Sequence, residues 1–112
     1  MSYHTDKGHL GEQLAMAWLL KQGYWVFKNL APQGPIDCIA VNENEIILVD
    51  VKVLSRYKNG FTRSRILTKR QKDLNVKILY VDIDNYECRW KRAKVTKSKE
   101  TGQFKKSPLT KI

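Results

Sequence analysis

Residues 34 to 53 read GPIDCIAVNENEIILVDVKV, and this stretch decides the fold. Two runs rich in apolar and β-branched residues, Ile36 to Val41 and Glu45 to Val53, are separated by the polar residues 42 to 44. Runs of this kind predict strands. Because the polar connection is short, the two strands are predicted to pair as an antiparallel hairpin.

Helices and strands are predicted on both sides of this hairpin. The apolar spacing over residues 8 to 22 predicts a helix that is capped by Thr5 or Asp6 at its start and ends at Gly23. The other predicted elements are a strand over 24–30, a basic loop over 57–65, a helix over 66–74, and strands over 76–83 and 86–95. This order predicts an α/β domain in which helices flank a mixed sheet.

The length of 112 residues fits one compact domain. We expect residues 1–92 to form this domain and the Lys-rich residues 93–112 to form either a terminal strand or a flexible tail. No apolar stretch is long enough for a membrane span and no secretory signal is visible, so a cytoplasmic location is expected. Cys38 and Cys88 have no CxxC spacing and no neighbouring His, which predicts buried, reduced thiols.

The formal net charge of +10 is unevenly distributed along the chain. Residues 1–50 carry three Lys against six Asp and Glu, a net charge of −3, whereas residues 51–112 carry 18 basic against five acidic residues, a net charge of +13. A basic half beside a slightly acidic half is suited to binding a polyanion, and nucleic acid is the natural candidate. The alternative is that the Lys-rich segments are only solvated.

Three carboxylates interrupt apolar segments of the sequence. Glu12 lies beside an apolar side of the first helix, and Asp37 and Asp50 each interrupt one strand of the hairpin. Lys52 is two residues after Asp50 and therefore shares its strand face. Alone, an Asp at a strand end is usually a turn former and a Lys is usually a surface charge. Because an unpartnered buried carboxylate is costly, convergence of these groups favours a bound cation.

This set of residues suits hydrolysis of a phosphodiester. A hard cation such as Mg²⁺ or Mn²⁺ binds through one or two carboxylates, waters and a phosphate oxygen. Asp37, Asp50 and the backbone carbonyl of Val51 would hold the metal, and Glu12 would complete the site, in part through water. Lys52 would orient the attacking water and stabilise the negative charge that develops on the phosphate.

Glu12 on the first helix, Pro35-Ile36-Asp37 and Asp50-Val51-Lys52 resemble the motif of the PD-(D/E)XK nuclease superfamily, especially its small Holliday-junction-resolvase-like endonucleases. The resemblance implies a restriction-endonuclease-like core with a central mixed sheet of four or five strands. It implies functional positions at Glu12, Asp37, Asp50 and Lys52, and an active-site association for Gln71 on the next helix. It also implies a homodimer, because one subunit supplies one site. Ile36 between Pro35 and Asp37 is a departure that the superfamily tolerates.

Basic residues follow Lys52 closely and are predicted to contact DNA phosphates without reading the bases. They are Arg56, Lys58, Arg63, Arg65, Lys69, Arg70 and Lys72. A second basic patch is the stretch 89–92, in which Trp90 is expected to pack in the core or in a subunit contact rather than to stack on a base.

The predicted function is that of a Mg²⁺-dependent DNA endonuclease, with Mn²⁺ able to substitute. Its small size and the lack of an added recognition domain favour structure-selective cleavage of branched DNA, such as a four-way junction. One alternative is a sequence-specific homing or restriction-type endonuclease. Another, from a different class, is a non-catalytic nucleic-acid-binding module on the same fold.

Overall fold

The structure is a computed structural model, and it describes residues 3–31, 33–54, 65–91 and 110–112. Two helices and six strands are present in these ranges. In chain order they are α1 (Tyr3–Lys21), β1 (Trp25–Lys28), β2 (Cys38–Val41), β3 (Ile46–Val53), α2 (Lys69–Asp73), β4 (Lys77–Asp82), β5 (Glu87–Trp90) and β6 (Thr110–Lys111).

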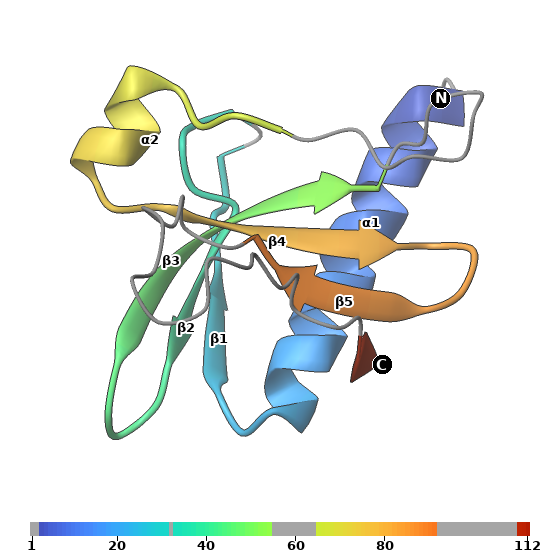
Figure 1. Cartoon of the computed structure of the whole chain (residues 1–112), viewed down its shortest axis with the longest axis horizontal. Coiled ribbons are helices and arrows are strands. Elements are labelled where there is room, and N and C mark those ends of the chain that lie inside the picture. Colours follow the sequence, from blue (N-terminus) through green and yellow to red (C-terminus); the bar gives the residue numbers. More distant parts are fainter. Residues whose placement is uncertain (1–2, 32, 55–64, 92–109) are drawn as a thin grey trace, which may run out of the picture.

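The six strands form one sheet in the order β1-β2-β3-β4-β5-β6 (Figure 1). Only β3 and β4 pair in parallel, and every other neighbouring pair is antiparallel. The predicted central mixed sheet is therefore confirmed, with β1 to β5 as its five main strands. The additional strand is the two-residue β6, which pairs with β5 at the sheet edge and brings the end of the chain into the sheet.

The predicted hairpin at residues 36–53 is present as β2 and β3. Its register pairs Val41 with Ile46 and Cys38 with Val49. The Asn42 side chain accepts hydrogen bonds from the backbone N–H groups of residues 44 and 45, and its own backbone N–H donates to the Glu45 carbonyl. Asn42 thereby supplies the local bonding that a tight polar turn requires.

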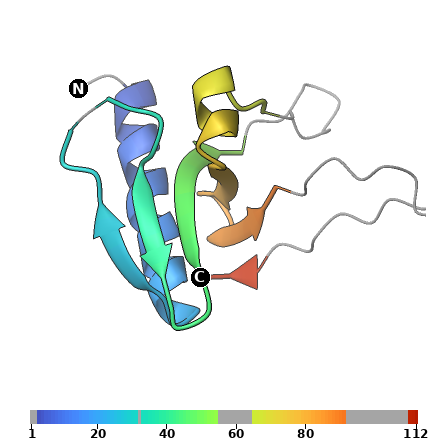
Figure 2. The same cartoon turned by 90° about the vertical axis from the view of Figure 1, so that its left-hand side faces the viewer.

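Helix α1 covers one face of the sheet and forms the core with it (Figures 1 and 2). Ala15 and Leu19 of α1 are fully buried against the side chains of alternate strand residues, such as Ala40, Val49 and Leu79. Gly11 allows this close approach, because a Cβ atom there would lie 2.5 Å from Cγ2 of Val53. The residues of β3 that alternate with this core set, including Asp50 and Lys52, therefore face away from α1.

The bounds of both helices differ from the sequence-based expectation. Helix α1 begins at Tyr3, so Thr5 and Asp6 lie within it and do not cap its start as expected. It ends near Gly23, as predicted, where a φ of 94° favours glycine. Helix α2 has five residues rather than nine, since Thr68 caps it and Leu74 ends it.

Two expectations about core residues are confirmed. Trp90 packs against Trp18 with ring centroids 6.0 Å apart in an edge-to-face arrangement, which is a core contact. Cys38 and Cys88 are both buried and free, and burial raises the pKa of each thiol to about 12. Within the described ranges, no helix has the length and hydropathy that crossing a membrane requires.

Candidate active site

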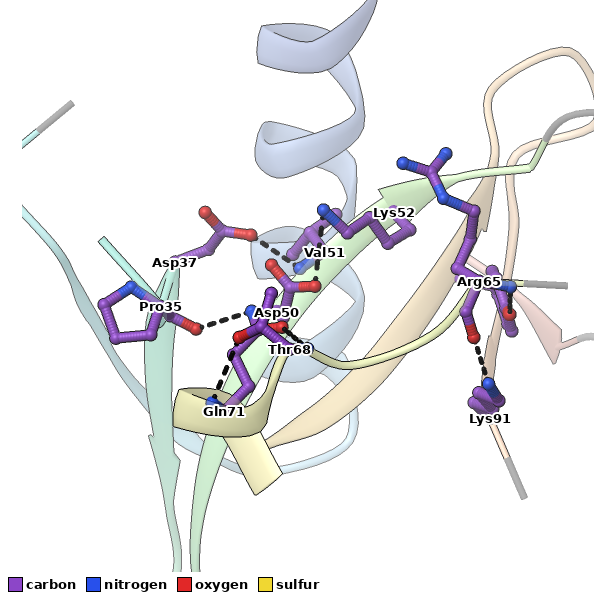
Figure 3. Close-up of polar contacts among 10 residues, drawn as sticks. Pro35, Asp37, Asp50, Val51, Lys52, Arg65, Thr68, Gln71 and Lys91 are labelled. Carbon is purple, nitrogen blue, oxygen red and sulfur yellow. Dashed lines mark hydrogen bonds and ion pairs between the residues drawn. The ribbon is translucent and has the colours of Figure 1, made fainter. Parts of the chain in front are cut away.

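Asp37 lies at the point where β2 separates from β3. Its backbone N–H donates to the Val49 carbonyl at 2.8 Å, which continues the ladder one residue before β2 begins. Its carboxylate then takes the next place in the ladder, because Oδ2 accepts the Val51 N–H at 2.6 Å. The backbone and the carboxylate of Asp37 are thus both attached to β3, which holds the carboxylate at this fork. Figure 3 shows the contact between the carboxylate and Val51.

Asp50 and Lys52 lie beside Asp37 on the sheet face opposite α1 (Figure 3). The Asp50 residue is only 4% exposed, and its Oδ2 lies 3.5 Å from Nζ of Lys52. This Oδ2 atom is buried and has no hydrogen-bond partner among the described residues. Burial raises the pKa of Asp50 to about 6; the Lys52 ammonium opposes this shift and the Asp37 carboxylate adds to it.

Glu12 approaches Asp37 from α1, on the other side of the sheet. Its pKa is raised by partial burial and by the negative charge of Asp37, and it is lowered to a lesser extent by His9 and Lys28. Asp37 therefore interacts both with Glu12 and with Asp50, while these two acids approach it from opposite faces of β3. Among the described residues, no three His, Cys, Asp or Glu side chains form a group that could hold a metal ion.

A cavity of about 490 Å³ opens beside Asp37, between α1 and the segment that joins β1 to β2. Glu12, Asp37 and Val51 line it, together with residues such as His9 and Lys28. In a strand, the N–H and C=O of one residue point to the same side. The Val51 carbonyl therefore points to the side on which its N–H meets Asp37. The cavity brings three of the predicted site residues together but leaves Asp50 and Lys52 on the other face.

Gln71 lies next to the site without lining the cavity, and its amide is engaged at both ends. Nε2 donates to the Pro35 carbonyl at 2.9 Å, and Oε1 accepts the Thr68 N–H at 3.0 Å in the capping box of α2. Gln71 is 7% exposed. These contacts place Gln71 as a link between α2 and the segment that leads into Asp37.

Asn29 holds the same segment from the β1 side, and its role was not predicted. Its backbone N–H donates to the Asp37 carbonyl at 3.0 Å, and Nδ2 donates to the Ile36 carbonyl at 2.9 Å. Its Oδ1 accepts the Ala31 N–H at 2.9 Å. The strand predicted over 24–30 includes Asn29, so neither a turn-forming role for this residue nor its partner seven residues away could be inferred from spacing.

The predicted DNA-binding residues are only partly described. The backbone of Arg65 is held at two points: its N–H donates to the Tyr80 hydroxyl at 2.8 Å, and its carbonyl accepts from the Lys91 ammonium (Figure 3). Three further basic side chains are exposed on α2, namely Lys69, Arg70 and Lys72. Arg56, Lys58 and Arg63 lie outside the described residues.

Comparisons with known sequences identify relatives over most of the chain. A model of the nuclease-related domain (NERD) family matches residues 7–112. A UPF0102 protein of Clostridioides difficile is 37% identical over 85 residues, which cover 73% of this chain and 75% of the relative. A UPF0102 protein of Clostridium perfringens is 33% identical over 100 residues, covering 79% and 77%. One from Cytophaga hutchinsonii is 39% identical over 69 residues, but the match spans only 61% of that relative.

A comparison with solved structures supports the same assignment at the level of the fold. The bacterial homing endonuclease I-Ssp6803I matches 80% of this chain with a TM-score of 0.62 and 19% sequence identity. The match covers 65% of the endonuclease chain, and at this identity it shows a common fold alone. The chain belongs to the nuclease-related domain family, and its fold is that of the PD-(D/E)XK nucleases.

Proposed function

We propose that the protein is a divalent-metal-dependent DNA endonuclease in which Asp37, Asp50 and the Val51 carbonyl hold the metal. The observation that carries this proposal is that the Asp50 carboxylate is buried with its hydrogen bonding incomplete. Its Oδ2 atom is buried beside a second carboxylate and lacks a hydrogen-bond partner among the described residues. Lys52, at 3.5 Å, offsets only part of this cost, so a further cation would stabilise the site.

The donor set fits Mg²⁺. In proteins this ion binds through one or two carboxylates and keeps waters and phosphate oxygens as its other ligands, so a group of three acidic side chains is not needed. Mn²⁺ accepts the same oxygen donors. When bound, such an ion polarises the phosphodiester and lowers the pKa of a water molecule. Glu12, which lines the same cavity as Asp37, would accept a hydrogen bond from water there.

The protein's own residues account for the remaining requirements of hydrolysis. Lys52 directs its ammonium group toward Asp50, where it would donate to an oxygen of the scissile phosphate and stabilise the developing negative charge. Asn29 and Gln71 would keep Asp37 in place through the backbone that precedes it. Rigid support of this kind is what orientation of reacting groups requires.

The substrate we propose is branched DNA, cleaved according to its structure. The described basic residues after β3 suit contacts to phosphates, which carry no sequence information. We also propose a homodimer, because each chain carries one site and cutting two strands at a junction needs two. A sequence-specific endonuclease and a non-catalytic DNA-binding module remain as competing functions that the following experiment separates.

The full chain should be incubated with end-labelled four-way junction, linear duplex and single-stranded DNA, in Mg²⁺, Mn²⁺ or EDTA. We expect cleavage of the junction with either metal and none in EDTA. Asp50→Asn should lower the cleavage rate by at least about 10²-fold, because it removes the charge that holds the metal and leaves the side-chain shape unchanged.

Asp84→Asn is the matched control, since Asp84 is an exposed acid in the turn between β4 and β5. This variant should cut at the parental rate. If no DNA is cut with either metal, the binding module replaces the nuclease. If Asp50→Asn cuts like Asp84→Asn, the assigned metal site is wrong. Cleavage of duplex at one sequence, with the junction left intact, favours the sequence-specific enzyme.

A further inference from the structure

A row of three side chains crosses the sheet next to the candidate active site. The strand register aligns Lys52 of β3 with Tyr80 of β4, and Tyr80 with Arg89 of β5. Directly paired residues point to the same sheet face. The row therefore shares the face of Asp50, opposite α1. Strands lie about 4.8 Å apart, so the backbones of Lys52 and Arg89 are separated by roughly 10 Å.

The Arg89 side chain is held over the ring of Tyr80. Its guanidinium carbon lies 5.1 Å from the ring centroid, and Tyr80 is 3% exposed and therefore a fixed platform. A guanidinium that lies on an aromatic ring keeps its N–H groups available at its edge, where they bind phosphate with two parallel hydrogen bonds. The stacking also removes much of the freedom that an exposed arginine would lose on binding.

The same tyrosine fixes a second basic residue next to the row. The Tyr80 hydroxyl accepts the backbone N–H of Arg65, and the Lys91 ammonium donates to the Arg65 carbonyl. Figure 3 shows Arg65 on the far side of Lys52 from Asp37. Tyr80 thus contacts Arg89 through its ring and the backbone of Arg65 through its hydroxyl, and both basic residues lie beyond Lys52, away from Asp37 and Asp50.

We propose that Arg89, supported by Tyr80, binds the sugar-phosphate backbone of DNA beside the phosphate at Lys52. Successive nucleotides of one strand rise about 3.4 Å along the helix axis, so roughly 10 Å along that axis corresponds to about three nucleotides. The row therefore sets the direction in which one strand leaves the active site, across β4 toward β5. Glu87, two residues from Arg89 along β5 and on the same face, belongs to the neighbouring row, in which it pairs with Asp82. This inference rests on the proposed function for the identity of its ligand.

The test measures DNA binding by the full chain in EDTA, where cleavage is not required. The affinity for a fluorescent four-way junction is followed by anisotropy between about 50 and 200 mM salt. Arg89→Ala should reduce the slope of log affinity against log salt by about 0.9, the value for one lost phosphate contact. Arg89→Lys should keep the slope, because its charge remains, but should bind severalfold more weakly, because lysine lacks the planar, two-pronged geometry.

Lys77→Ala is the matched control, because Lys77 is an exposed residue of β4 on the face that carries α1. It should leave the slope unchanged, and thermal unfolding should show that all variants are folded. An unchanged slope in Arg89→Ala, or an equal loss in Lys77→Ala, would overturn the inference. If Arg89→Ala lowers the slope while the parent cuts no DNA with any metal, the backbone site is supported and the nuclease proposal fails. If the parent cuts DNA and Arg89→Ala leaves the slope unchanged, only the backbone site is wrong.

Discussion

Asp37 shows how a single residue joins the fold to the site. At the fork between β2 and β3, its carboxylate replaces the backbone carbonyl that would otherwise receive the Val51 N–H. The strand pairing can therefore stop without leaving this donor unsatisfied. The hydrogen bond also fixes the carboxylate between Glu12 and Asp50. The hydrogen bond that allows the pairing of β2 and β3 to end therefore also orients the Asp37 carboxylate within the candidate site.

Asp50 should make the stability of the metal-free protein depend on pH. Its pKa of about 6 in the folded state is above its ordinary value of 3.8, so the folded state binds more protons than the unfolded state between these values. The free energy of unfolding should therefore fall as the pH rises from about 4 to about 6. Each pKa unit corresponds to about 1.4 kcal/mol, which gives an upper limit of about 3 kcal/mol for this group.

This dependence can be measured by urea unfolding in EDTA from pH 4 to pH 7, with Asp50→Asn beside the parent. Asparagine does not titrate, so the difference between the two curves isolates Asp50 from Glu12, which is present in both. The variant should be the more stable protein above pH 6. Parallel curves for the two proteins would show that the Asp50 carboxylate is not destabilised in the fold.

The predictability of the site from sequence differs among its residues. Asp37, Asp50 and Lys52 stand out because charged residues interrupt apolar strands, and alternation along a strand predicts that Asp50 and Lys52 share a face. The opposite approach of Glu12 could not be predicted, since it depends on how α1 crosses the sheet. Spacing alone also could not show that the Gln71 amide is engaged by Pro35 and Thr68, 36 and three residues away.

At the scale of elements, the short helix α2 depends on a contact outside itself. Five residues are too few for a stable isolated helix. Its capping box between Thr68 and Gln71 satisfies two backbone N–H groups, and the Gln71 amide continues to the Pro35 carbonyl. The helix and the segment before Asp37 therefore stabilise one another, and α2 reaches the site through the backbone of that segment.

Two substitutions separate the capping of α2 from its link to Pro35. Thr68→Ala removes the side-chain cap and should cost about 1 kcal/mol of stability. Gln71→Glu keeps an acceptor for the Thr68 N–H but replaces the donor to Pro35 with a carboxylate oxygen that faces a carbonyl. If Asp37 is positioned through Pro35, Gln71→Glu should lower the maximal cleavage rate at saturating Mg²⁺ far more than Thr68→Ala does.

The readout is the maximal cleavage rate beside the free energy of unfolding for each variant. A role limited to stability would make the loss of rate follow the loss of stability in both proteins. Equal rates in the two variants would therefore exclude a positioning role for Gln71. Gln71→Met, which removes both hydrogen bonds at similar volume, should resemble Gln71→Glu in rate.

At the scale of the whole molecule, the sheet face opposite α1 changes character along β3. Its first two cross-strand rows are apolar, with Trp25, Val41 and Ile46 in one and Phe27, Ile39 and Leu48 in the other. Asp50 comes next, and the row of Lys52, Tyr80 and Arg89 follows. From the start of β3 to its end, this face is therefore first apolar, then acidic and then basic.

The fold as a whole was easier to predict than its edges. Strands β2, β3 and β4 are apolar enough to be recognised, and their order predicts the mixed sheet. The bounds of α1 and α2 were wrong because helix ends depend on capping and tertiary contacts more than on periodicity. Strand β6 lies in a Lys-rich segment with little strand character of its own. It forms by pairing with β5, and Ile112 then packs against the core.

The two apolar rows lead to a test of the predicted homodimer. Trp25 and Phe27 are each 59% exposed and Ile46 is 71% exposed, and all three lie on the sheet face opposite α1, on or near the edge strand β1. Contiguous exposed apolar surface of this kind is typical of an interaction site. Pairing of two copies through these rows would place two active sites beside the interface, as cleavage of two strands requires.

Sedimentation equilibrium should show a dimer for the parent and a monomer for Trp25→Ser/Phe27→Ser. Leu20→Ser, which changes an equally exposed leucine at the end of α1, should remain dimeric. A monomeric parent at tens of micromolar, or a dimer that survives the double substitution, would contradict association through this face.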